Sequence, residues 1–116
     1  MAALVGLEPS PTETDFEAGA WAFKALSDPA RLKIMVHLAQ SRSGSGECCG
    51  SAEAGAVCAC DLEAITGLSQ PTVSHHMKCL VSASLVTAEK RGRWMYYSID
   101  PRGLTLVEGI LSGFRR

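Results

Sequence analysis

The stretch from Val57 to Leu80, VCACDLEAITGLSQPTVSHHMKCL, constrains the fold more than any other part of the chain. It predicts a short first helix from Asp61 to Ile65 that ends at Gly67, since glycine tolerates the left-handed conformation of a tight turn. A second helix is predicted to follow, with Ser69 as its N-cap and Pro71 in its first turn, where amide groups lack intrahelical partners. Two short helices joined in this way are typical of a helix-turn-helix.

The second helix of this pair has a predicted buried face and a predicted outward face. Val73, Met77 and Leu80 recur at i, i+4 and i+7, so they should share the buried face. The same pattern also fits a solvated polar face on an ordinary helical hairpin. If the unit reads DNA, the outward side chains can hydrogen-bond base edges and phosphates in a major groove; these side chains are Gln70, Thr72, Ser74, His75 and Lys78.

A β-hairpin is predicted directly after this unit. Ser84 to Glu89 reads as one strand, Lys90 to Arg93 as the turn, and Trp94 to Ile99 as a second strand rich in aromatic and β-branched residues. Arg91 and Arg93 near the tip can reach phosphates or a narrow minor groove. A basic turn alone could serve only solubility, but a basic hairpin after a helix-turn-helix favours a DNA-binding wing.

Four segments together resemble the ArsR-SmtB family of winged-helix, metal-sensing repressors. They are ALSDPARLKIMVHL, VCACDL, SQPTVSHHMKCL and LVTAEKRGRWMYYSI, which lie between Phe23 and Ile99. VCACDL is similar to the cysteine motif of the arsenic-responsive branch of that family. The resemblance implies a homodimeric transcriptional repressor that binds double-stranded operator DNA and releases it when a toxic metalloid or metal binds.

Cysteines are the candidate ligands of such an ion. Cys58 and Cys60 form a Cys-x-Cys pair, and the vicinal Cys48 and Cys49 lie in a Gly- and Ser-rich stretch, residues 41–56, that is predicted to be a mobile loop. Soft thiolates select soft or thiophilic ions. Three sulfurs suit trivalent arsenic or antimony, and four suit tetrahedral zinc or cadmium. Cys79, in the second helix, is expected to be a packing residue.

The resemblance favours arsenite as the inducer, bound by Cys58, Cys60 and one of Cys48 or Cys49, with antimonite as a second candidate and zinc or cadmium behind them. The sequence leaves open which of the vicinal pair takes part, and whether it does so within one subunit or across a dimer. Positions i and i+2 of an α-helix point about 200° apart. Cys58 and Cys60 therefore cannot both bind one ion while both lie in regular helix. Closing the site is expected to distort or unwind the start of the first helix and so to disfavour the DNA-bound geometry.

Three more helices complete a predicted domain over residues 15–116, behind a flexible tail over residues 1–14. They run from Asp15 to Ser27, from Pro29 (after an N-cap at Asp28) to about Gln40, and from Arg102 to Phe114. The fold class is therefore mainly α with a small β-hairpin (α+β), a winged helix-turn-helix. The apolar stripes of the first and last helices predict a two-fold dimer interface built from Phe16, Ala20, Phe23, Leu104, Val107, Ile110, Leu111 and Phe114.

The charge is unevenly distributed along the chain. The net charge is −1, but residues 69–98 contain four cations and one anion, a net +3, so the remainder carries −4. The basic charge is therefore gathered on the proposed reading surface. The chain shows no apolar run of the roughly 20 residues that cross a bilayer and no secretory signal at its start, which predicts a cytoplasmic protein.

Several function classes fit these features. The leading one is a repressor of a metalloid-resistance operon that arsenite or antimonite releases from its operator. A repressor of the same family that responds to cadmium, lead, zinc or mercury is an alternative, as is a DNA-binding regulator that senses thiol oxidation. A thiol-rich interaction module without DNA is a third class. No nucleophile, base and orienting group occur together, so an enzyme is not expected.

Overall fold

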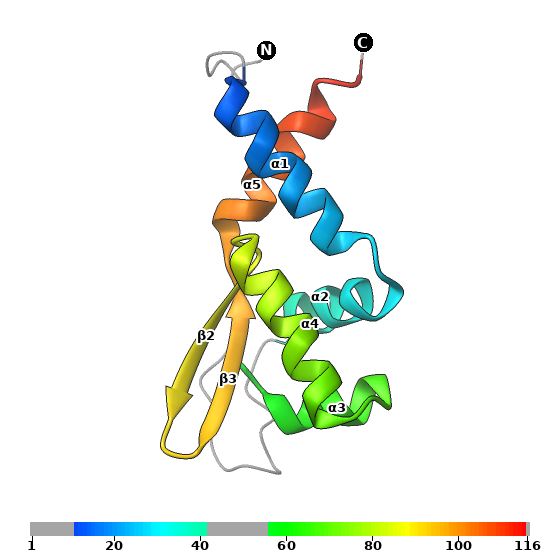
Figure 1. Ribbon diagram of the computed structural model, residues 1–116, viewed down its shortest axis with the longest axis vertical. Coiled ribbons are helices and arrows are strands. Elements are labelled where there is room, and N and C mark those ends of the chain that lie inside the picture. The colour runs from blue at the N-terminus through cyan, green and yellow to red at the C-terminus, as the bar shows by residue number, and fades with distance from the viewer. Residues whose placement is uncertain (1–10, 42–55, 116) are drawn as a thin grey trace.

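The computed structural model describes residues 11–41 and 56–115 of the chain (Figure 1). This part contains helices and a small antiparallel sheet, as the sequence predicts. The elements, in chain order, are α1 (Glu13–Leu26), α2 (Pro29–Gln40), β1 (Val57–Cys58), α3 (Ala59–Thr66), α4 (Gln70–Ser82), β2 (Val86–Arg91), β3 (Trp94–Ile99) and α5 (Pro101–Ser112).

Local hydrogen bonds account for where most of the helices begin and end. The Asp28 carboxylate caps α2 by accepting from the Ala30 amide at 2.8 Å, and Asp100 caps α5 in the same way by accepting from the Arg102 amide at 3.0 Å. Gly67 ends α3 in the left-handed conformation, with φ 72°. Ser69 is the N-cap of α4 as predicted, but its hydroxyl contacts the Thr72 hydroxyl at 3.0 Å and makes no capping bond to the backbone. Gly67 and Ser69 thus bound the turn of the helix-turn-helix, α3–α4, whose helices contact α2 and β2.

The sheet has the strand order β1–β3–β2, with both pairs antiparallel. β1 was not predicted; it is a two-residue strand in which Val57 pairs with Tyr97 and Cys58 with Tyr96. β2 begins two residues later than predicted, because Ser84 adopts a positive φ of 60° and is part of the turn that follows α4. β2 also extends to Arg91, which leaves a tighter hairpin turn.

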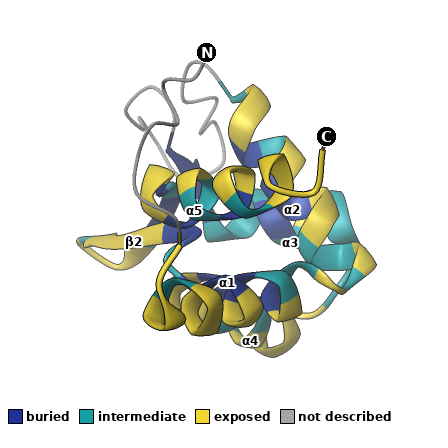
Figure 2. Ribbon diagram, turned by 90° about the horizontal axis from the view of Figure 1, so that it is seen from above, coloured by how far each residue is buried: buried dark blue, intermediate teal, exposed yellow. Residues whose placement is uncertain are grey.

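The main core lies where α1, α2, α3, α4 and the sheet meet (Figure 2). The predicted buried face of α4 is confirmed, since Val73, Met77 and Leu80 are all at most 2% exposed. The other largest buried side chains of this core come from α2, α3, the turn before β2 and the first residue of β2: Ile34, Leu62, Leu85 and Val86. Side chains of both α2 and the sheet therefore pack in the core with the helix-turn-helix.

α1 and α5 pack against each other at one end of the molecule, and the hairpin and α3 lie at the other end (Figure 1). Two glycines allow this arrangement. A Cβ at Gly19 of α1 would meet the side chain of Ile110 of α5, and a Cβ at Gly103 would meet the backbone oxygen of Ser84. The Gly103 amide donates to that same oxygen at 2.8 Å, so α5 is hydrogen-bonded to the turn that follows α4. None of the described helices is long and apolar enough to span a membrane.

Candidate functional site

The outward side chains of α4 fall into two groups. Gln70, Ser74 and Lys78 line an open hollow of about 350 Å³ between α4 and the sheet, whose far wall is formed by Ala88, Met95 and Tyr97. Thr72 and His75 are exposed. The Nε2 atom of His75 lies 3.8 Å from the Sγ atom of Cys79. All five predicted reading residues lie on the surface of α4, although Ser74 is half-buried.

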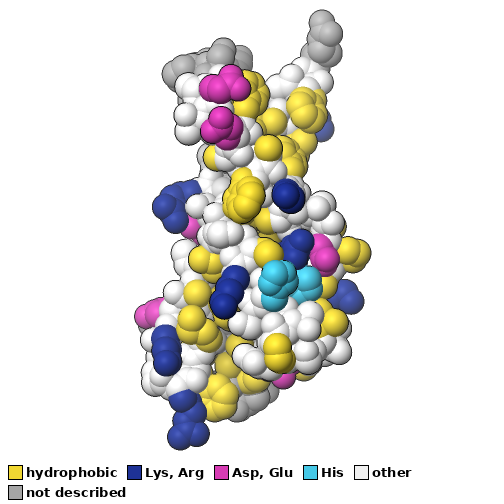
Figure 3. Space-filling view, in the orientation of Figure 1, with side chains coloured by type: hydrophobic (Ala, Val, Ile, Leu, Met, Phe, Trp, Pro, Cys, Tyr) yellow, Lys and Arg dark blue, Asp and Glu magenta, His cyan; other side chains and the backbone are white. Residues whose placement is uncertain are grey.

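Basic side chains near the hairpin turn differ in how firmly they are held. Lys90 and Arg93 are exposed, and Figure 3 shows dark blue side chains gathered at this end of the molecule. Arg91 instead lies against its own hairpin: Nη2 is 2.9 Å from Oε1 of Glu89, and the guanidinium carbon lies 5.0 Å from the ring centroid of Tyr96. The hydrogen bond and the charge of Arg91 lower the pKa of Glu89 below its ordinary value. Arg93 is thus the more open of the two predicted wing arginines.

The Cys58 and Cys60 sulfur atoms lie 3.2 Å apart. Cys58 is in β1 with extended backbone and is fully buried, whereas Cys60 is the second residue of α3 and is half-buried. The two cysteines therefore do not both lie in regular helix, which was the condition for the predicted helix distortion. The strand-to-helix junction at Ala59 brings both sulfurs to one place, which corrects the expected geometry. Cys60 is disulfide-bonded in this structure, so it can offer a thiolate to a soft ion only after that bond is reduced.

The remaining cysteines are placed as follows. Cys48 and Cys49, the candidates for a third sulfur, lie outside the described residues. Cys79 is half-buried on α4 beside His75. Within residues 11–41 and 56–115, no group of three or more His, Cys, Asp or Glu side chains is arranged to hold a metal ion. The described part of the chain thus offers a two-sulfur fragment whose chemistry fits a thiophilic ion.

The predicted dimer face is divided between surface and core. Phe16, Leu111 and Phe114 are 49%, 44% and 70% exposed, and Ala20 is exposed as well. The others face inward: Val107 is buried in the main core, Phe23 and Leu104 pack against that core, and the side chain of Ile110 fills the space next to Gly19. The open apolar surface is therefore smaller than the predicted stripe, because part of the stripe joins α5 to its own chain.

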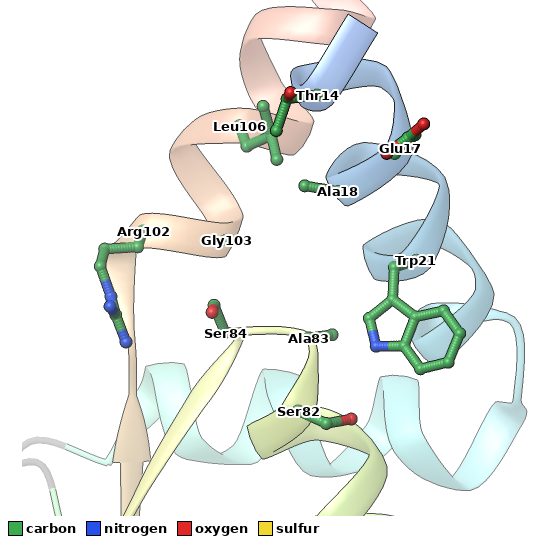
Figure 4. Close-up of a pocket in the computed structure, with 10 residues that line it drawn as sticks. All are labelled: Thr14, Glu17, Ala18, Trp21, Ser82, Ala83, Ser84, Arg102, Gly103 and Leu106. Atoms are coloured by element: carbon green, nitrogen blue, oxygen red, sulfur yellow. The ribbon is translucent and has the colours of Figure 1, made fainter.

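A hollow of about 500 Å³ lies beside that surface, between α1, the turn after α4 and the start of α5 (Figure 4). Figure 4 shows Trp21 and Glu17 on its α1 side and Arg102 on its α5 side. Trp21 is 54% exposed and lies near the Lys24 ammonium, which is 5.8 Å from the ring. In the sequence Trp21 falls off the apolar face of its helix, so this exposed indole was not counted in the predicted interface.

Two contacts of α4 and the hairpin were missed from the sequence. An Nη1 atom of Arg31 lies 2.8 Å from Nδ1 of His76, and its Nε donates to the Ala25 carbonyl at 2.6 Å, so one side chain joins α1, α2 and α4. Tyr96, Ala56 and Cys58 form a second buried cluster, with Cys60 packed against it. Only the hydrophobic character of Tyr96 was visible in the sequence, because its contacts depend on the pairing of β1 with β3.

Comparison with known proteins gives this arrangement a family. The chain matches the family described as bacterial regulatory protein, arsR family, over residues 28–88. It is 38% identical over 90 residues to the arsenical resistance operon repressor of Bacillus subtilis, covering 78% of this chain and 70% of that protein. It is 37% identical over 86 residues to the probable mercury resistance operon repressor of Streptomyces lividans, covering 73% of this chain and 58% of that protein.

A solved structure with the same fold is the homodimeric winged helix-turn-helix DNA-binding domain of a possible ArsR-family transcriptional regulator from Mycobacterium bovis. Its TM-score is 0.64 at 24% identity, and the match covers 97% of this chain and 88% of that one. The predicted winged helix-turn-helix fold is therefore confirmed. The prediction of a DNA-binding regulator, and not an enzyme, is confirmed by the family match. Because residues 28–88 make up more than half of the chain, this protein belongs to the arsR family of DNA-binding transcriptional regulators.

Proposed function

We propose that this protein is a cytoplasmic repressor of a metalloid-resistance operon, and that it leaves its operator when arsenite binds at Cys58 and Cys60. The observation that carries the proposal is the separation of 3.2 Å between the two sulfur atoms, which lie at the entrance to the helix-turn-helix. A trivalent arsenic atom needs converging soft ligands, and thiolates supply them. One of Cys48 or Cys49 would provide the third sulfur.

The position of the pair suggests how an ion would act on DNA binding. Cys58 belongs to β1, which is hydrogen-bonded to β3 of the hairpin, and Cys60 belongs to the first turn of α3. An ion held by both would link the sheet to the helix that packs against α4. Any ion that changes operator affinity in this way must itself be bound more weakly by the same factor when operator is present.

DNA would be read by two copies of α4. In this proposal Gln70, Thr72, Ser74, His75 and Lys78 face the major groove, and Arg91 and Arg93 of the wing lie near the backbone or minor groove. The exposed apolar residues of α1 and α5, at the opposite end of the molecule, would join two subunits so that both copies meet one imperfect palindrome. The homodimeric state of the Mycobacterium bovis relative supports this arrangement.

The test is a fluorescence-anisotropy titration of the protein with duplex DNA from upstream of its own gene, in a reducing buffer. Arsenite is added in steps, with antimonite, mercuric ion, cadmium and zinc as comparators. We expect tight binding that is lost at low arsenite. Cys58→Ser and Cys60→Ser should each keep DNA binding and lose the response, whereas Cys79→Ser, the matched control, should keep both. Cys48→Ser and Cys49→Ser tested singly then identify the third sulfur.

Each other outcome points to a different function. Release by arsenite from the Cys58→Ser and Cys60→Ser variants would overturn the assignment of the thiol pair. Release by mercuric ion or cadmium alone would replace the inducer, and the resemblance to the Streptomyces lividans protein makes mercuric ion the first comparator. Release by peroxide without an arsenite response would favour a redox sensor. Absence of specific DNA binding would leave a thiol-rich interaction module.

A further inference from the structure

Tyr96 lies between the Cys58–Cys60 pair and the wing. It is opposite Cys58 in the β1–β3 register and opposite Glu89 in the β2–β3 register. Residues directly opposite in antiparallel strands project from the same face of a sheet. Cys58, Tyr96 and Glu89 therefore form one row across all three strands, and Arg91, two residues after Glu89, projects from the same face.

The Tyr96 side chain contacts two parts of the protein. It shares a buried cluster with Ala56 and Cys58, and Cys60 packs against that cluster. The Arg91 guanidinium carbon lies 5.0 Å from the centroid of its ring, in a cation–π arrangement. Arg91 is also held by Glu89 at 2.9 Å. One ring thus touches both the candidate sensing cysteine and a proposed DNA-contacting arginine.

We propose that Tyr96 is a positioning residue that couples ion capture at Cys58 and Cys60 to the placement of Arg91 on the wing. In the ion-free protein the ring holds Arg91 where it meets a phosphate. Ion capture moves the ring, and Arg91 loses that position. This inference rests on the proposed function, because it describes how the same thiol site acts on DNA.

Packing explains why the ring should move. The Cys58 and Cys60 sulfurs already lie 3.2 Å apart. An arsenic atom that binds both must be placed against these two packed sulfurs, so groups around them must move to admit it. Cys58 is fully buried and Tyr96 is 4% exposed. Close-packed interiors transmit such displacements instead of absorbing them, and Tyr96 is the large side chain of this cluster.

The experiment compares Arg91→Gln with Arg93→Gln, which remove equal charge from the same hairpin. For each protein the ratio of operator affinities without and with saturating arsenite is measured, together with the salt dependence of the ion-free affinity. Both variants should bind DNA more weakly, and each should lower the salt slope by about one for each phosphate that the protein no longer neutralises. Only Arg91→Gln should shrink the arsenite ratio, by about three-fold or more, because it is the Arg91 guanidinium that lies against the ring.

Tyr96 itself is tested in the same assay. Tyr96→Leu should shrink the arsenite ratio as Arg91→Gln does, and the double variant should shrink it no further. Tyr96→Phe keeps the aromatic ring and should have the same arsenite ratio as the wild type. Circular dichroism and the absorbance of the arsenic–thiolate bond check that each variant is folded and still binds arsenite.

The outcomes separate this inference from the proposal on which it rests. If the wild-type protein keeps its DNA in the presence of arsenite, the proposed function fails and the coupling fails with it. If the wild type is released but Arg91→Gln has an unchanged ratio, the coupling through Tyr96 is overturned and the proposed function stands. Because Arg91 is partly exposed, this second result is obtained even if Tyr96→Leu does not fold.

Discussion

The end of the molecule formed by α1 and α5 and the end formed by α4 and the hairpin differ in the side chains that they leave at the surface. The first exposes large apolar groups, among them Phe16, Leu111 and Phe114. The second exposes polar and basic groups such as Gln70 and Arg93, together with the less exposed apolar side chains of Val81 and Trp94. Uncompensated apolar surface favours association with another protein surface, whereas cations favour phosphates. In the proposed function, assembly and DNA binding would therefore take place at opposite ends of one small chain.

The largest effect is expected from a charge at the apolar end. Phe16→Asp should dissociate the proposed dimer and lower operator affinity by on the order of 100-fold, because two half-sites are no longer bound together. The fold should survive, since Phe16 is 49% exposed. Sedimentation velocity measures the dimer and fluorescence anisotropy the affinity. Leu32→Asp on α2, at the same 49% exposure, is the matched control and should remain dimeric. A dimeric Phe16→Asp protein would show that the subunits meet elsewhere.

Substitutions at two glycines test how closely α5 packs on the turn after α4. Gly103→Ala should destabilise the protein by about 2 kcal/mol, since the new Cβ meets the Ser84 backbone, which cannot rotate away. Gly109→Ala, with open space at its Cβ position, should stabilise the helix by about 0.5–1 kcal/mol. Urea unfolding followed by circular dichroism gives both values. Equal effects of the two substitutions would mean that α5 is not held by this contact.

Removal of single cations from α4 and the hairpin should have smaller effects on operator affinity. Lys78→Ala and Arg93→Ala should each weaken operator binding by roughly ten-fold and lower the slope of log affinity against log salt by about one per phosphate contact. Lys24→Ala, which removes a cation from α1 at the other end, should leave the slope unchanged. An equal loss of slope in all three variants would indicate that net charge, and not position, governs binding.

The smallest effect expected is a change in stability with pH at Asp100, the N-cap of α5. Arg102, through its side-chain and backbone hydrogen bonds, lowers the pKa of this carboxyl below its ordinary value. A lowered folded-state pKa stabilises the fold above the unfolded pKa of about 4, and this contribution disappears as pH falls through the folded pKa. Wild type should therefore exceed Asp100→Asn in stability at pH 7 and approach it near pH 3. Urea midpoints at both pH values test this, and a constant difference would contradict it.

Local sequence patterns made much of α2, α3 and α4 predictable. The spacing of Val73, Met77 and Leu80 identifies the buried face of α4, and Gly67 and Asp28 mark helix boundaries by chemistry that needs no distant partner. The third strand was not predictable in this way. A two-residue strand has no periodicity of its own, and β1 exists only because β3, far along the chain, pairs with it.

The candidate site shows the same limit. The Cys58–Cys60 spacing pointed to a thiol site, but it could not show that Cys58 is in a strand, so the expected distortion of α3 was based on the wrong local geometry. Arg91 and Arg93 are equivalent in the sequence pattern, yet Glu89 and Tyr96 hold Arg91 against the hairpin. The apolar stripe of α5 likewise did not reveal that Val107 packs into the core of its own chain.

The short pairing of β1 with β3 has a consequence for the speed of any response. Cys58 is fully buried, so an ion reaches its sulfur only when the surrounding segment opens. A ladder of two residues is among the first parts of a fold to open, and such local openings occur many times for each global unfolding event. The rate of ion capture would then be set by the frequency with which β1 detaches. Amide hydrogen exchange at Val57 and Cys58, measured at a pH high enough that every opening leads to exchange, would report that frequency.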